Sequence, residues 1–149
     1  MITYRLATGK YAEDISGTGS KLYGGRWNPV GISMLYTSQY ISLALLEVLA
    51  RMSRHTIPDS YTLISLEIPD VPTAKLNLNK LKKGWEGDLL YSQGIGEDFI
   101  KDNQFSCLQV PSAIVAQEHN LLFNPNHKDF KKIKIIKTEL LNIDKRLKA

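Results

Sequence analysis

Five polar side chains in this sequence stand beside apolar or glycine-rich residues and could do chemistry. They are Arg5, Arg26, Tyr36, Glu47 and Ser112. Arginine can bind a phosphate or a carboxylate through paired hydrogen bonds. The five side chains gain functional weight only together, as a set. Spacing along the chain does not by itself establish that they converge.

Each of these side chains also has a purely structural explanation. Arg5 would be a charge at the rim of a strand, and Tyr36 would be a core-edge residue with its hydroxyl in water. Glu47 could pair with Arg51 one helical turn away, which contributes only about 0.3–0.5 kcal/mol if exposed. Ser112 could serve a turn.

Arg26 lies in the most distinctive stretch of the chain, YGGRWNP at residues 23–29. Glycines let a backbone approach a ligand closely or take a positive φ, and the Asn-Pro pair favours a turn. The structural alternative is a tight loop with one surface arginine and one core tryptophan.

Other kinds of chemistry find less support. Ser112 lacks the glycine pattern of a nucleophile elbow, and Cys107 lies in an apolar run, where we expect it to be buried and inert. His55, His119 and His127 are isolated and there is no cysteine pair, so we expect no metal site. A Walker loop and a complete dinucleotide-binding glycine motif are both absent.

The hydrophobic pattern predicts an α+β domain with more strand than helix. We expect helices over 42–54, part of 85–92 and 96–103. We expect strands at 1–6, 32–37, 61–68, 105–110, 113–117, 120–123 and 132–140, the last at a sheet edge. The connection at 7–31 is long enough to suggest a functional loop. The helix at 42–54 is apolar nearly all round, so we expect it to be buried with Glu47 facing a partner or a cleft.

Length and composition set the remaining limits. The 149 residues suit one domain, 1–149, and a single cysteine fits a reducing, cytoplasmic setting. No signal peptide and no membrane-spanning run are expected. A net charge of +4 and a lysine-rich tail leave a non-catalytic RNA-binding module as an alternative of another class. The tail lacks the interleaved aromatics of a single-strand binder, so we do not expect direct nucleic-acid binding.

Several blocks of the chain, in order, resemble the RES domain, a family named for an arginine, a glutamate and a serine. The blocks are GGRWNP at 24–29, LYTS at 35–38, SLALLE at 42–47, VPSA at 110–113, EHN at 118–120 and NPNH at 124–127. The likeness extends from Arg5 to about Phe130. One departure is Lys128, where the family often has proline.

The resemblance implies an ADP-ribosyltransferase-like fold, a split β-sheet with flanking helices around an NAD cleft. It implies a toxin of a bacterial type II toxin–antitoxin system that depletes NAD+, its substrate, by cleaving the nicotinamide–ribose bond, by hydrolysis or phosphorolysis. The alternative is a mono-ADP-ribosyltransferase that modifies a cellular protein. The residues leave open whether the acceptor is water, phosphate or a protein.

The resemblance also assigns roles, with no metal involved. Arg5 and Arg26 would bind the NAD phosphates, and Tyr36 would stack on the nicotinamide or the ribose. Glu47 would be the catalytic acid, and Ser112 would hold the ribose or the glutamate. The implied partner is an Xre-type helix-turn-helix antitoxin that blocks the cleft. A homodimer is also implied, although the sequence has no long apolar stripe from which to derive one.

Overall fold

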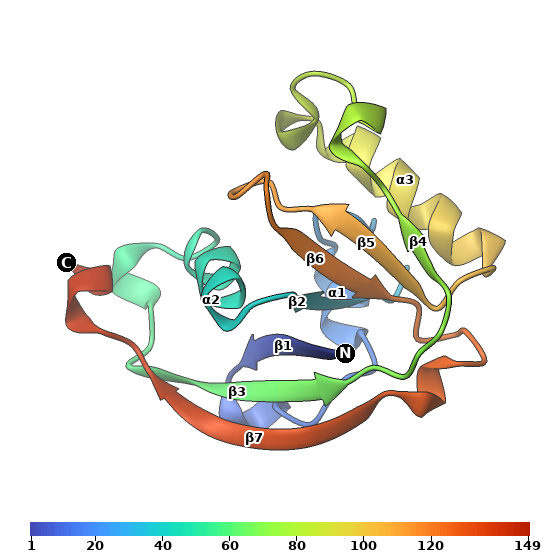
Figure 1. Ribbon diagram of the computed structural model, residues 1–149. Helices are drawn as coiled ribbons and strands as arrows, with labels where there is room; N and C mark the ends of the chain where they lie inside the picture. The colour runs from blue at the N-terminus through green and yellow to red at the C-terminus, as the bar shows by residue number, and fades with distance from the viewer.

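A seven-stranded sheet runs through the protein, described here by a computed structural model that covers residues 1–149 (Figure 1). The strands are β1 Ile2–Ala7, β2 Leu35–Ser38, β3 Ser60–Glu67, β4 Thr73–Lys75, β5 Cys107–Pro111, β6 His119–Phe123 and β7 Lys134–Asn142. Their order is β4-β5-β6-β2-β1-β3-β7, and only β4 and β5 run parallel. The helices are α1 Thr18–Tyr23, α2 Ile41–Leu49 and α3 Leu89–Asp102. The predicted α+β class is confirmed.

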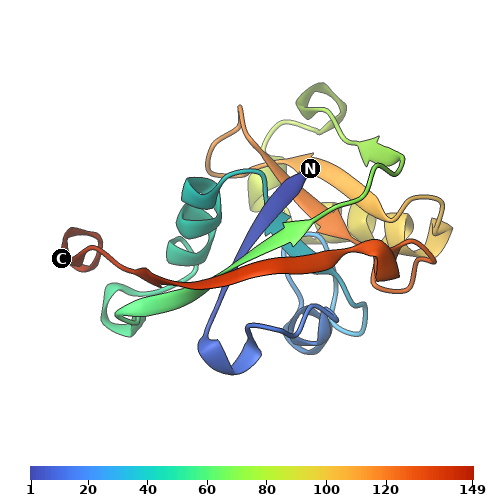
Figure 2. The same cartoon turned by 60° about the horizontal axis from the view of Figure 1, so that its bottom comes forward.

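The sheet is nearly divided between β1 and β2. These two strands meet in register only where Tyr4 lies opposite Ser38. By contrast, β1 pairs with β3 from Ile2 to Ala7, and β2 pairs with β6 along its whole length. We call the β1–β2 junction the seam. On one side of the seam lie β1, β3 and the long outer strand β7, which runs along the lower edge in Figure 1 and across the front of the molecule in Figure 2. The split sheet is therefore as predicted.

The two longer helices cover the same face of the sheet, one on each side of the seam. α2 packs on β1 and β3 in a cluster that includes Leu6 and Ala44. α3 packs on β5 and β6 in a cluster that includes Ile100 and Leu122. Since alternate residues of a strand share a face, the register across the seam puts both clusters on one side. The other face is closed by the segments that follow β1 and β6, through a third cluster.

Two helical predictions need correction. α2 begins at Ile41, with Tyr40 rather than Ser42 at its N-cap, and ends at Leu49. It packs through one face only: Leu43 and Ala44 are buried, but Leu46 is 42% exposed, so the predicted complete burial is wrong. The two helices expected at 85–92 and 96–103 are one continuous helix, α3, that runs through both Gly94 and Gly96.

The strands follow the alternating pattern more closely. β1, β3, β6 and β7 lie within two residues of their predicted limits, and β7 is an edge strand as expected. The strand predicted at 113–117 is a turn, because the Ser112 hydroxyl accepts the backbone N–H groups of Ile114 and Val115. The connection at 7–31 is more regular than expected, since it contains α1.

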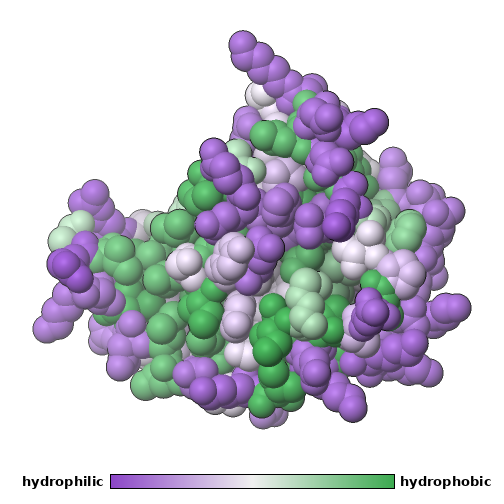
Figure 3. Space-filling model, viewed as in Figure 1, coloured by the Kyte–Doolittle hydropathy of each residue, from purple (hydrophilic) through white to green (hydrophobic).

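The face of the molecule shown in Figure 3 carries both polar and apolar side chains. In Figure 3, apolar side chains gather around α2, and hydrophilic residues cover much of the rest of the visible face. None of the helices combines the length and the apolar character needed to cross a lipid bilayer.

Candidate functional site

The carboxylate of Glu47 is held at the seam by two side chains from distant parts of the sequence. Its Oε1 accepts a hydrogen bond of 2.7 Å from the Ser112 hydroxyl and another of 2.7 Å from Asn120 Nδ2. Glu47 itself is half-buried, and its Oε2 accepts no hydrogen bond from the protein. The ion pair with Arg51, the structural alternative for Glu47, does not form. One carboxylate oxygen is therefore fixed and the other is free for a ligand.

Ser112 is built to hold a carboxylate rather than to attack a substrate. It is 1% exposed, and its oxygen accepts the backbone N–H groups of Ile114 at 3.0 Å and Val115 at 3.1 Å. A hydroxyl has one proton to donate. That proton goes to Glu47, so none remains for a ribose oxygen in this arrangement.

Asn120 was absent from the predicted site. It lies at the start of β6 directly opposite Ser38 at the end of β2, and its Oδ1 accepts a 2.6 Å hydrogen bond from the Ser38 hydroxyl. Its Nδ2 faces Glu47. Both residues fall within blocks that resemble the RES domain, but only the pairing of β2 with β6 reveals their contact. The sequence therefore contained both residues in recognisable blocks, but it did not reveal that Asn120 contacts Glu47.

The hydroxyl of Tyr36 is occupied by protein groups. It donates to Asn28 Oδ1 at 2.5 Å and accepts the backbone N–H of Trp27 at 3.0 Å. Burial raises the pKa of this hydroxyl, and the Trp27 hydrogen bond and the charge of Arg51 offset only part of the rise. Tyr36 therefore stays protonated at neutral pH, and only its ring is left to contact a ligand.

The GGRWNP loop is fixed from within by Asn28. This side chain is fully buried, and its Nδ2 donates to the carbonyls of Ser20 and Ile32 at 2.8 Å each. A Cβ at Gly25 would lie 2.6 Å from the Tyr36 hydroxyl oxygen, so glycine is needed there to let the loop close on Tyr36.

Helix α3 fixes the same loop from outside. Ser92 donates to the carbonyl of Arg26 at 2.5 Å, and Gln93 donates to the carbonyl of Gly25 at 2.9 Å. Trp27 packs on Trp85 with ring centroids 5.4 Å apart. The loop is thus held from both sides, and it carries Arg26, which is half-buried.

Three arginines, Arg5, Arg26 and Arg51, have no carboxylate partner. Arg26 donates to the carbonyl of Glu86 at 2.7 Å and lies over the Trp85 ring, 5.8 Å from its centroid. The positive charges of Arg26 and Arg51 both reach Tyr36, where each lowers the pKa of the hydroxyl. None of Arg5, Arg26 and Arg51 forms an ion pair. Unpaired guanidinium groups favour an anionic ligand.

Arg5 is set apart from Glu47. It shares a face of β1 with Ala7, whereas Leu6 faces α2, and its guanidinium donates to the carbonyl of Tyr11 at 3.4 Å. Burial lowers the pKa of Arg5, the charge of Asp14 raises it, and the charge of Arg51 lowers it. The structure thus brings Ser112 into contact with Glu47, while Arg5 lies within the field of Arg51 and does not touch the carboxylate.

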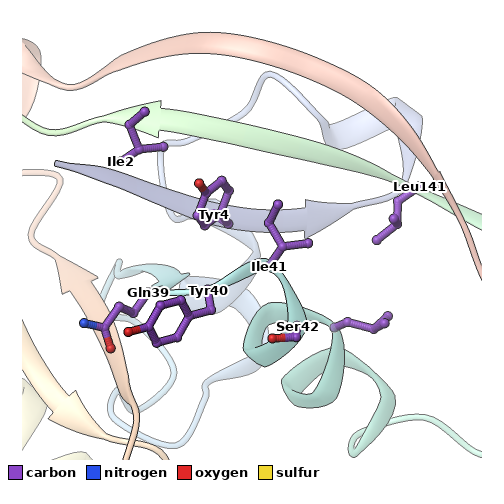
Figure 4. Close-up of a pocket in the computed structure, with 8 residues that line it drawn as sticks. Ile2, Tyr4, Gln39, Tyr40, Ile41, Ser42 and Leu141 are labelled. Atoms are coloured by element: carbon purple, nitrogen blue, oxygen red, sulfur yellow. The ribbon is translucent and has the colours of Figure 1, made fainter.

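An apolar groove of about 700 Å³ lies next to this site but does not include it. Figure 4 shows its walls, which come from β1, the beginning of α2 and β7 and include Tyr4, Tyr40, Leu45 and Leu141. No predicted site residue lines the groove. Since it offers no charged group to an anion, we place the chemistry at Glu47 and not here.

Two further expectations concerned the single cysteine and the residues that could bind a metal. Cys107 is fully buried, as expected, and burial raises the pKa of its thiol to about 12. No group of three or more histidine, cysteine, aspartate or glutamate side chains is arranged to hold a metal ion.

The sheet is split, and a glutamate from a covering helix is held at the seam. This arrangement is typical of a small ligand-binding or catalytic domain. The RES domain profile matches residues 2–144, and the chain belongs to the RES domain family. It is 38% identical over 151 aligned positions to "Toxin Res" of Photorhabdus laumondii, covering 99% of this chain and 97% of that protein. It is 35% identical to the "Prs ADP-ribosylating toxin" of a Sphingobium species, covering 91% and 88%. Both relatives are named as toxins, and each matches most of this chain.

A solved structure shares the fold. The chain superimposes with a TM-score of 0.73 on a chain from the crystal structure of the M. tuberculosis MbcT–MbcA toxin–antitoxin complex, covering 95% of this chain and 84% of that one. Sequence identity is 19%, so this likeness concerns the fold alone.

Proposed function

We propose that this chain is the toxin of a bacterial toxin–antitoxin pair and that it depletes NAD+ by cleaving the nicotinamide–ribose bond. The observation that carries the proposal is the Glu47 carboxylate, with Oε1 held by Ser112 and Asn120 and Oε2 open. The toxin names of its relatives, one of them ADP-ribosylating, support it.

The chemistry asks for one well-placed negative charge. Nicotinamide is already cationic in NAD+, so it leaves with the bonding electron pair and needs no added proton. The ribose carbon is then positive, the problem also met in glycoside hydrolysis. A fixed carboxylate oxygen near that carbon, hydrogen-bonded to the ribose 2′-hydroxyl, stabilises the cation in the transition state. In this proposal the oxygen is Oε2 of Glu47.

The other groups bind and orient. The guanidinium of Arg26 suits the pyrophosphate, and the ring of Tyr36 suits the face of the nicotinamide or ribose. Arg5 would add positive charge near the phosphates without touching Glu47. A water or phosphate oxygen forms the new bond to the ribose carbon, and with water the released proton passes to solvent. These roles of Arg5, Arg26, Tyr36 and Ser112 remain proposals.

The test is incubation of the purified protein with NAD+, with and without phosphate, followed by identification of the products by mass. We expect nicotinamide together with ADP-ribose or its phosphorylated form. Glu47→Gln should lower turnover by about 10²- to 10³-fold, the usual effect of removing a charge-stabilising group. Glu139→Gln, on the outer strand β7, is the matched control and should leave turnover unchanged. Full turnover by a folded Glu47→Gln variant would refute the proposal.

Transfer of ADP-ribose to a protein is the second candidate, and the 35% identical Prs ADP-ribosylating toxin favours it. Labelled NAD+ incubated with cell lysate would then mark a discrete protein band, and the mark would depend on Glu47. Free ADP-ribose without a labelled band would argue for hydrolysis.

We also propose a cognate antitoxin, of the Xre helix-turn-helix type, that blocks the NAD-binding region. The fold shared with a chain from a toxin–antitoxin complex supports a protein partner. Co-expression with the product of the neighbouring gene should restore growth and suppress NAD+ loss. Growth arrest that persists despite a soluble complex would count against this partner.

A further inference from the structure

A chain of two hydrogen bonds leads from a buried serine to the catalytic carboxylate. The Ser38 hydroxyl donates to Asn120 Oδ1 at 2.6 Å, and Asn120 Nδ2 donates to Glu47 Oε1 at 2.7 Å. We infer that Ser38 and Asn120 are positioning residues that fix the direction of the Glu47 carboxylate. The inference rests on the proposed function, because it concerns the same reaction.

The direction of the Asn120 amide follows from the two groups that flank it. An amide offers an acceptor oxygen on one side and a donor nitrogen on the other. An ionised Glu47 requires the nitrogen, and the Ser38 hydroxyl can satisfy the oxygen. In the flipped amide, Oδ1 would face Oε1 and two acceptors would be in contact. Ser38 therefore favours the one orientation that supports Glu47.

Ser38 does not touch Glu47 and influences it only through Asn120. It is also only 4% exposed, so a direct contact with substrate is not its role. It sits at the seam, opposite Tyr4 of β1 on one side and Asn120 of β6 on the other. Ser112, from the turn after β5, supplies the second hydrogen bond to the same oxygen. Two anchors from different segments prevent the carboxylate from swinging about a single contact, and both act on Oε1, so Oε2 accepts no hydrogen bond from the protein.

The test measures kcat and KM for NAD+ consumption in single and double variants. Ser38→Ala should lower kcat by about 2- to 12-fold and Asn120→Ala by about 10- to 100-fold, as expected for a neutral and a charge-assisted hydrogen bond. KM should change less than about twofold in both, since neither residue acts on substrate binding. Ser38→Thr keeps the hydroxyl and should restore most of the activity.

The double variant decides whether the two residues act in series. Because Ser38 works only through Asn120, Ser38→Ala/Asn120→Ala should match Asn120→Ala alone within about twofold. Ser106→Ala, which removes another buried serine hydroxyl away from the seam, is the control and should have wild-type kinetics. Multiplied effects in the double variant, or a wild-type kcat in Ser38→Ala, would overturn the inference. If instead Glu47→Gln consumed NAD+ as fast as the wild type, the proposed function itself would be overturned.

Discussion

Two glycines of α3, two positions apart, should respond to the same substitution in opposite ways. A Cβ at Gly96 would lie 1.6 Å from the carbonyl oxygen of Trp27, 2.7 Å from its carbonyl carbon and 3.2 Å from Met34 Cε. A Cβ at Gly94 meets no atom within 4 Å. Both residues are inside the helix, so alanine at either site gains the same helical propensity.

The magnitudes follow from these distances. Glycine to alanine in a helix interior stabilises by about 1 kcal/mol, and this is the whole expectation for Gly94→Ala. At Gly96 the clash is with backbone, so the helix and the loop must separate by at least roughly 1.5 Å to reach a normal contact. Overpacking of this kind costs about 1–3 kcal/mol, and here the hydrogen bonds from Ser92 and Gln93 to the loop are also strained. Because the gain in helical propensity is common to both, we expect the two variants to differ by about 1–3 kcal/mol.

Urea unfolding of the two variants beside the wild type measures this difference as a free energy of unfolding. NAD+ turnover is the second measurement, because a displaced loop carries Arg26 and the groups that hold Tyr36 with it. Gly94→Ala should be at least as stable and as active as the wild type, and Gly96→Ala should be impaired in both respects. Equal stability of the two variants would show that α3 does not approach the loop as described, and the account of the loop would fail.

Two further outcomes are expected. Tyr36→Phe removes the hydroxyl that hydrogen-bonds both the Trp27 N–H and Asn28 Oδ1. Urea unfolding should therefore show that the free energy of unfolding falls by about 1–3 kcal/mol. A fall of less than about 0.5 kcal/mol would contradict the role of this hydroxyl in holding the loop. Burial raises the pKa of the Cys107 thiol from 9.0 to about 12, so native protein should resist a thiol reagent at pH 8 and react once unfolded. The unfolded chain releases this proton more readily than the native one. The contribution of the protonated Cys107 thiol to the free energy of unfolding is therefore complete below about pH 9 and declines as pH rises toward about 12. Stability that does not fall in this range in wild type relative to Cys107→Ala would contradict it.

The sequence anticipated the parts of this fold that depend on local pattern. Alternation located most of the strands, and the apolar run located α2. The sequence pattern predicted the wrong secondary structure where a tertiary contact decides it. Gly94 and Gly96 suggested a break between two helices, whereas Gly96 lets one helix approach the Trp27 carbonyl. The segment 113–117 has strand-like residues, but the Ser112 hydroxyl turns it by accepting two backbone N–H groups.

The candidate site was foreseen as a set of residue types, and its geometry was not. Ser112 and Glu47 are 65 positions apart, and only the seam between the halves of the sheet brings them together. Asn120 could not be assigned a role from sequence, because its contact with Glu47 depends on the pairing of β2 with β6. The role of the Tyr36 hydroxyl was equally hidden, since its partners lie in a loop with no periodic pattern.

The four residues of β2 connect the two parts of the site. Tyr36 ties the strand to the GGRWNP loop through Asn28 and Trp27, and two residues later Ser38 ties the same strand to Asn120. Because alternate residues of a strand share a face, both contacts point to the side that α2 and α3 cover. Most of the loop motif therefore serves to build this arrangement, while the guanidinium of Arg26 donates to the carbonyl of Glu86. A displacement of the loop would therefore act through β2 on Asn120, which donates to the carboxylate of Glu47.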